Sequence, residues 1–305
     1  MDRTTINIGP GMVTWDGISI HVEDDIKMMI SPKMFDVMTA GHGKVDSRRE
    51  DLQIEVSLTP KMWTELAKLF PYATTEVGAS IYGATDKPLV ITPRTGGANS
   101  GWTLTNAAIT KLPSVTLSRN KAILGDMTFT GILANSGDPA DISDYLATSA
   151  SAALTGFDLA KIPNGLYTAA WGTVITGVHS EDGFVIDFDL SLEDTVVDGL
   201  GTIDKRLAGL GATCKVVPVG PNAQDVLDVH GLTTAIGQAP PKNSLVITGG
   251  VTGMPIVTLA NCIAQTSSGQ TGTKAKRLGE MEFSTLRTAT SGVINALWTF
   301  AEVGA

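Results

Sequence analysis

Side chains that could do chemistry are few in this chain of 305 residues, and they do not converge. Asp187 and Asp189 could act as a carboxylate pair, but in FVIDFDL they alternate with apolar residues and are expected to form the polar face of a strand. No nucleophile elbow, phosphate-binding glycine loop or dinucleotide fingerprint is present. The histidines are scattered, without the spacing of metal ligands: His21, His42, His179 and His230. We therefore expect no catalytic residue, no cofactor, no metal site and no enzymatic activity.

The most informative charged residues belong to a duplicated segment. Residues 41–60 (GHGKVDSRREDLQIEVSLTP) align without a gap with residues 199–218 (GLGTIDKRLAGLGATCKVVP). Chance at typical composition would give about one identical pair. The alignment has six: Gly41/Gly199, Gly43/Gly201, Asp46/Asp204, Arg48/Arg206, Leu52/Leu210 and Pro60/Pro218. We interpret the two segments as one structural unit used twice.

The charged pair Asp46 and Arg48 returns in the second segment as Asp204 and Arg206. One interpretation is a turn stabilised by an Asp side chain beside an exposed Arg. The other is an ion pair across a subunit junction. The duplication alone does not distinguish these two interpretations.

The elements that would position these residues are strands. Asp16-Gly17 stands between two β-prone runs, which is typical of a two-residue hairpin turn. Residues 39–51 and 199–211 are polar and contain glycine, and we expect each to form a long hairpin arm or loop. The first leads into a strand in which every second residue is apolar: Leu52, Ile54, Val56 and Leu58.

A short helix is expected after this strand. Thr59 as the N-cap and Pro60 as the first helical residue predict a helix that ends at Phe70. Residues 221–227 predict a shorter equivalent in the second half of the chain.

The repeat extends over nearly the whole chain. The segment LVIT occurs at residues 89–92 and again at 245–248, and LGDMTF at 124–129 returns as LGEMEF at 278–283. The composition, with 33 glycines and only 17% charged residues, favours a β-rich chain with many turns. We predict a mainly β fold of two tandem homologous β-sandwich or β-barrel domains, residues 1–152 and 153–305, each with one short α-helix.

Charge and targeting signals restrict the partners. The net charge is -9, and no basic stripe is present that could neutralise phosphates, which argues against tight nucleic-acid binding. The N-terminus lacks a signal peptide, and no run of eighteen apolar residues exists, so we expect a soluble intracellular protein without a membrane segment. Cys214 and Cys262 are expected to be small buried residues.

The order of these elements resembles the tail tube protein family of long-tailed bacteriophages. The resemblance is carried by the hairpin at Asp16-Gly17, the arm at residues 41–51, the strand and helix at residues 52–70, the closing strand at 124–132 and their second copies. It implies a virion structural protein whose two tail-tube-like domains form homotrimeric rings of pseudo-sixfold shape. These rings would stack into a hollow tube through which DNA is ejected.

The resemblance also implies partners and a place. The partners would be further copies of the chain and other tail proteins, namely the tape measure, the tail terminator and the baseplate or distal tail proteins. DNA would pass through transiently without specific binding. The protein would be assembled in the host cytoplasm and reside in the phage tail, and the duplicated form implies a non-contractile tail.

Two sets of site residues follow from this implied function. The arms would reach a neighbouring subunit or ring through Gly43, Asp46, Arg48, Gly201, Asp204 and Arg206. A polar, acidic bore that repels DNA phosphates would be lined by Gln53, Glu55, Ser57, Asp187 and Asp189. Charge reversal at Arg48 and Arg206 together would then block tube formation and leave a folded protein.

Three other functions stay open at this point. The chain could be another phage ring component, such as a baseplate, tail-terminator or decoration protein. It could be a tandem β-sandwich that binds carbohydrate, although 6% aromatic residues and the missing signal sequence argue against this. A hydrolase with its site at the domain junction would need a positioned acid, base or metal.

Overall fold

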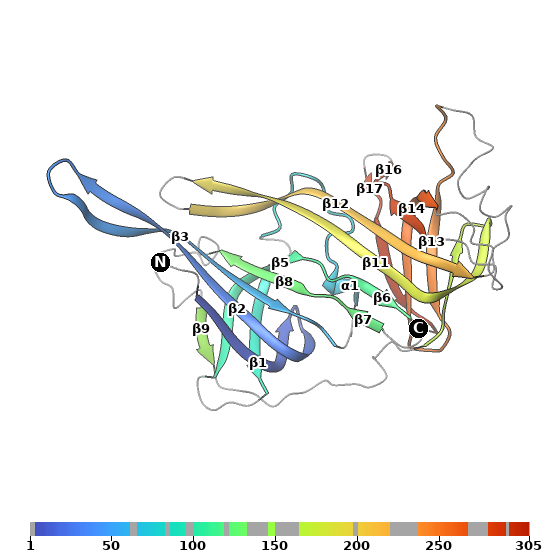
Figure 1. Ribbon diagram of the computed structural model, residues 1–305, viewed down its shortest axis with the longest axis horizontal. Helices are drawn as coiled ribbons and strands as arrows, with labels where there is room; N and C mark the ends of the chain where they lie inside the picture. The colour runs from blue at the N-terminus through green and yellow to red at the C-terminus, as the bar shows by residue number, and fades with distance from the viewer. Residues whose placement is uncertain are drawn as a thin grey trace.

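The computed structural model describes residues 4–61, 66–82, 86–94, 100–118, 122–132, 146–149, 165–197, 201–219, 237–267, 280–290 and 293–304. Within these ranges the chain is almost entirely β-strand, and its one helix is α1 (Leu66–Leu69). The strands form two large antiparallel sheets that lie side by side (Figure 1). The prediction of a mainly β fold with two homologous domains is confirmed. The predicted boundary at residues 152 and 153 lies outside the described residues and stays a prediction.

The first sheet closes into a barrel. Its strands follow the order β4-β1-β2-β3-β8-β5, and β5 pairs with β4 again. A further strand, β9 (Leu146–Ser149), pairs with β5. The six barrel strands are β1 (Thr4–Trp15), β2 (Ile18–Thr39), β3 (Gly43–Leu58), β4 (Lys87–Pro93), β5 (Gly101–Lys111) and β8 (Met127–Ile132).

The second sheet closes in the same way. Its barrel order is β13-β14-β15-β12-β11-β10, and β10 pairs with β13. The strand β18 (Trp298–Glu302) pairs with β14, and β16 (Ala289–Thr290) with β17 (Val293–Ile294) forms a separate small hairpin. The six barrel strands are β10 (Tyr167–Trp171), β11 (Ile175–Val197), β12 (Gly201–Val219), β13 (Asn243–Gly249), β14 (Pro255–Ser267) and β15 (Met281–Thr285).

The two barrels agree in register as well as in strand order. Trp15 pairs with Leu89 in the first barrel, as Trp171 pairs with Leu245 in the second. Between β3 and β8, Val56 pairs with Phe129, and the corresponding pair between β12 and β15 joins Cys214 and Phe283. The internal repeat is therefore one barrel built twice.

The hairpin at Asp16 and Gly17 forms as predicted. Trp15 pairs with Ile18, and both turn residues have positive φ, 47° for Asp16 and 75° for Gly17. Positive φ at both central residues is the requirement of a type I′ turn, which Asp-Gly satisfies well. The second copy has a longer turn, because Trp171 pairs with Ile175.

The alternating strands place their apolar side chains in the barrel interiors. The inward positions of β3 and β11 are buried, and their neighbours in sequence face outward. This confirms the predicted core positions: Leu52, Ile54, Val56, Leu58, Phe184, Ile186 and Phe188.

The predicted start of the first helix is wrong. Pro60 forms a β-bridge with Val22, and Lys61 N–H donates to the carbonyl of His21 at 3.0 Å. These contacts keep Pro60 and Lys61 out of a helix. Helical geometry is described for Leu66–Leu69, and residues 62–65 lie outside the described residues. The helix expected at residues 221–227 lies outside the described residues.

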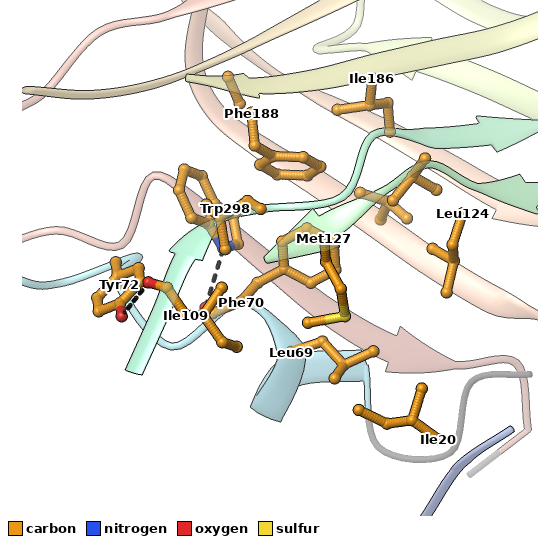
Figure 2. Packing of buried hydrophobic residues seen from close by; sticks show 14 of the residues in the cluster. Ile20, Leu69, Phe70, Tyr72, Ile109, Leu124, Met127, Ile186, Phe188 and Trp298 are labelled. Carbon is orange, nitrogen blue, oxygen red and sulfur yellow. Dashed lines mark hydrogen bonds between the residues drawn. The ribbon is translucent and has the colours of Figure 1, made fainter. Parts of the chain in front are cut away.

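The barrels meet through an aromatic cluster. Phe70, just after α1, lies 4.5 Å from Phe188 and 4.7 Å from Phe300 between ring centroids. Trp298 packs edge-on against Phe188, and its indole N–H donates to the carbonyl of Phe70 at 3.3 Å (Figure 2). One aromatic residue from the first copy is thus enclosed by three from the second.

A strand pair of the first copy also joins the second sheet. β6 (Val115–Leu117) pairs with β11, Leu117 opposite Phe184 and Val115 opposite Ile186, and β7 (Ala122–Leu124) pairs with β6. The two barrels therefore share backbone hydrogen bonds as well as side-chain packing.

Candidate functional site

Each barrel extends one long hairpin beyond its body. We call residues 33–51, from β2 and β3, the first arm, and residues 191–209, from β11 and β12, the second arm. The strand that returns from each tip begins with a glycine of positive φ, 70° at Gly43 and 73° at Gly201. Figure 1 shows both arms running in the same direction, the second arm over the first barrel and the first arm past it. The hairpin-arm prediction is confirmed for both copies.

The two arms share the same irregularities in their strand pairing. In the first arm the pairing shifts register between Lys33 and Met34 and again between Val37 and Met38. The second arm shifts at the corresponding positions, between residues 191 and 192 and between residues 195 and 196. A β-bulge bends a strand and increases its local twist. The two arms are therefore shaped alike, and a difference in their contacts reflects what lies beside them.

The duplicated Asp–Arg motif forms the same ion pair in both arms. Arg48 Nε lies 3.0 Å from Asp46 Oδ2, and Arg206 Nε lies 3.2 Å from Asp204 Oδ2. Each pair joins two residues of one strand, so the interpretation as part of a turn is wrong. An ion pair between chains stays a prediction.

These contacts affect the acidity of the first arm. The Arg48 side chain, followed by the Ser47 backbone N–H, holds the pKa of Asp46 below its ordinary value. Lys44, 2.6 Å away, and the Ser47 hydroxyl lower the pKa of Asp36 in the same way. Both carboxylates stay charged at neutral pH.

The second arm is docked on the first barrel along its backbone. Gly78 N–H donates to the carbonyl of Leu207 at 2.7 Å, and Leu207 N–H donates to Ala79 at 2.9 Å. Ile81 N–H donates to Lys205 at 3.0 Å, which makes Ser80 and Arg206 a β-bridge pair. The segment 78–81 thus extends the outer edge of β12 as a short strand.

Side chains strengthen this contact near the arm tip. Thr202 Oγ1 donates to Asp51 Oδ2 at 2.8 Å, and Gln53 Nε2 donates to Thr202 Oγ1 at 3.0 Å. Ser80 Oγ donates to Asp204 Oδ1. A Cβ atom on Gly201 would lie 2.7 Å from the Cβ of Asp51, so glycine is required by the space as well as by its positive φ.

The base of the first arm takes part in this contact through Asp51, but its outer part, residues 41–49, has no such contact within the described residues. Its tip, residues 41–49, is exposed throughout, whereas the corresponding second-arm residues 201–207 are mostly buried or half-buried. Leu207 is 1% exposed, whereas the corresponding Arg49 is exposed to solvent. Both arms leave large apolar side chains exposed, namely Phe35, Met38 and Val45 in the first arm and Val196 and Val197 in the second.

The residues expected to line a bore lie on corresponding faces of the two barrels. Glu55 pairs with Met29 and Gln53 pairs with Ser31 across β2 and β3. In the repeat, Met29 and Ser31 correspond to Asp187 and Asp189 on β11. Glu55 and Ser57 are half-buried, Asp187 is half-buried and Asp189 is exposed. Gln53 instead takes part in the contact between the copies through Thr202. Whether this face lines a bore stays a prediction.

An open cleft of about 480 Å³ lies beside Asp187 and Asp189, between β11 and residues 110–114 of the first copy. Its other charged side chains are Lys111 and Asp126. The described residues contain no group of three His, Cys, Asp or Glu side chains placed to hold a metal ion. Among the described helices, none is long and apolar enough to cross a membrane.

The cysteines are buried as expected. Burial raises the pKa of the Cys214 thiol strongly and that of Cys262 to about 12. Both thiols are therefore protonated and unreactive at neutral pH.

The residues that receive the second arm were not predicted from the sequence. Asp51 stands in the charged run RRED, which has the composition of an exposed segment, yet it is only 8% exposed. The segment 78–81 carries a signal that was available: TTEVG at residues 74–78 returns as TTAIG at residues 233–237.

No protein-family model matches the chain, and no curated protein matches it.

Proposed function

We propose that this chain is a structural subunit that assembles as stacked rings into the hollow tail tube of a long-tailed phage. The observation that carries the proposal is the head-to-tail arrangement of two homologous barrel units within one chain. The arm of the second barrel is docked on the first, while the arm of the first extends free in the same direction (Figure 1).

A head-to-tail contact between two units can be repeated from each unit to the next. Such a contact uses two different surfaces of each unit, so it generates a ring when the rotation closes and a filament when it does not. Each barrel has already closed its own sheet, and within the described residues the first arm presents an unpaired strand edge beyond the barrel that is available for pairing with another unit. Three chains of two barrels would form a ring of six pseudo-equivalent units, as in the resembling family.

The polar outer faces provide a surface for the bore. Glu55 on β3 pairs with Met29, whose counterpart in the second copy is Asp187, so the two carboxylates lie on corresponding faces of the two barrels and a ring would repeat them around its axis. A surface of this charge repels phosphate and lets DNA pass without the release of counterions that holds a DNA-binding protein in place. The net charge of -9 agrees with this role.

Negative-stain electron microscopy of the purified full-length protein tests the proposal. We expect long hollow tubes with a regular axial repeat, at high protein concentration or after seeding with preformed tubes. Chains that stay monodisperse monomers under all such conditions would overturn it. Single rings that do not stack would instead support the related function of another phage ring component.

A further inference from the structure

The unequal state of the two arms requires an explanation. They share length, register shifts, tip glycine and Asp–Arg pair, yet only the second has a receiving strand. The difference arises because the first barrel is the receiver for the second arm, and nothing in the described chain is placed to receive the first arm. If the arm is a docking device, its receiver belongs to another molecule.

The second barrel carries a counterpart of the receiving segment. Gly78, which begins that segment, has φ +88°, and the matching Gly237 has φ +89°. Residues 237–240 are exposed, so their backbone is accessible. The same sequence motif thus ends twice in a glycine of the same positive φ, and the residues that follow this glycine are paired with an arm in the first copy and exposed in the second.

We propose that the first arm docks on the second barrel of a neighbouring copy, along residues 237–239 and over Gly209 and Gly211. This inference rests on the proposed function, because it assigns the contact that joins one chain to the next in the ring. By correspondence with the docked arm, Gly237 N–H donates to the carbonyl of Arg49, and Arg49 N–H donates to that of Gln238. The third bond is absent, since Pro240 has no N–H.

Side-chain sizes on the arm and on its receiver are complementary both in the observed contact of the second arm and in the proposed contact of the first arm. Within the chain, a small arm residue, Thr202, meets the longer Asp51 and Gln53. Between chains, the corresponding arm residue is the long Lys44, and it meets Gly209 and Gly211. A Cβ atom on Gly211 would have no atom within 4 Å, so there is open space above it.

The charges of Lys44 and Asp189 agree with this placement of the first arm on the second barrel. Asp189 pairs with Gly211 across β11 and β12 and is exposed, which provides a carboxylate beside the place of Lys44. In the free arm Lys44 is paired with Asp36 at the exposed surface. Val45 is 51% exposed, whereas the corresponding Ile203 of the docked arm is half-buried. Docking would therefore cover an apolar side chain that the single chain leaves in water.

Engineered disulfides test the contact directly. Ser80 and Arg206 form a non-hydrogen-bonded antiparallel pair, the closest kind, and their counterparts are Ala239 and Arg48. The variant Arg48→Cys with Ala239→Cys is oxidised under assembly conditions and analysed on a non-reducing gel. We expect loss of the monomer band and covalent multimers. The matched control, Ser80→Cys with Arg206→Cys, should form its disulfide within one chain and give no multimers, as should each single variant.

A second variant uses the open space at Gly211. Gly211→Gln has room within its own chain, so we expect normal folding, but its side chain would occupy the place of Lys44 and raise the protein concentration needed for assembly. Val251→Gln, an exposed change at the opposite end of β13 from residues 237–239, is the control and should assemble normally.

The outcomes separate this inference from the proposed function. Tubes without cross-linked multimers would overturn the inference and leave the proposed function standing. Cross-linked multimers that never stack into tubes would support the inference and count against the tube. A protein that neither assembles nor cross-links between chains would overturn both.

Discussion

At the scale of residues, one buried carboxylate joins the two copies. Asp51 accepts hydrogen bonds from Leu52 N–H at 2.8 Å, from Gln53 Nε2 at 3.3 Å and from Thr202 Oγ1 at 2.8 Å. Three donors from two copies converge on it. A buried acid is tolerated only when it is bonded in this way.

Removal of this carboxylate should weaken the chain measurably. In Asp51→Ala the Thr202 hydroxyl and the Gln53 amide lose a partner, and we expect a loss of about 1–3 kcal/mol of unfolding free energy in urea. The control is Asp46→Ala, whose ion pair is solvent-exposed, and this variant should leave the unfolding free energy almost unchanged. Equal losses in the two variants would contradict the assigned role of Asp51.

The acidic residues of the first arm should titrate abnormally. Lys44 lowers the pKa of Asp36 and Arg48 lowers that of Asp46, so their contribution to arm structure is present above the ordinary pKa of 3.8 and is lost as pH falls through the depressed values. Carboxyl carbon chemical shifts, followed by NMR, should give midpoints below 3.8 for both. Lys44→Met should move the midpoint of Asp36 upward and leave Asp46 nearly unchanged; no movement would disprove the assigned cause.

At the scale of elements, the arm tips combine one backbone requirement with two environments. Gly43 and Gly201 both adopt positive φ, but only Gly201 is also enclosed, by Glu50 and Asp51. The same glycine thus meets a conformational requirement in one arm and a conformational and steric requirement in the other.

Alanine substitutions should separate these requirements. Gly43→Ala would strain the backbone by about 1–2 kcal/mol, which should speed amide exchange in the first arm and leave the melting temperature almost unchanged. Gly201→Ala adds a clash with Asp51 and should lower the melting temperature by undocking the second arm. A larger thermal effect from Gly43→Ala would be inconsistent with a free first arm.

The elements also show what the sequence could predict. Local patterns were sufficient for the Asp16-Gly17 turn, for the alternation from Leu52 to Leu58 and for the repeat, because turn chemistry and side-chain period act over a few residues. Pro60 misled the helix prediction, since its bridge to Val22 depends on a strand far away in sequence. The contact of Leu207 with residues 78–79 could not be inferred from either segment alone, because it depends on how the barrels are placed.

At the scale of the whole molecule, the barrels are coupled rather than merely linked. Phe70 packs among Phe188, Trp298 and Phe300, and β6 of the first copy extends the sheet of the second. Unfolding of one barrel would remove both contacts from the other. We therefore expect the chain to unfold in a single cooperative transition.

Removal of the Phe70 phenyl ring should break this coupling between the barrels. Phe70→Ala removes the aromatic side chain between the barrels, and we expect about 3–5 kcal/mol of destabilisation and two resolved transitions in differential scanning calorimetry. The control, Phe129→Ala, removes an equal ring from inside the first barrel and should lower stability without removing the contacts between barrels. A single transition in Phe70→Ala would mean that the backbone pairing suffices for coupling.

The docking of the second arm within the chain has a consequence for when assembly can begin. The second arm and its receiver belong to one chain, and for short linkers such a connection gives an effective concentration in the millimolar range. The second arm is therefore docked in every folded chain, however dilute the protein is. Under the proposed assembly, the first arm would meet its receiver only at the free concentration of the protein. The chain would therefore enter assembly as a preformed pair of barrels, and the amount of accumulated protein would set the onset of polymerisation.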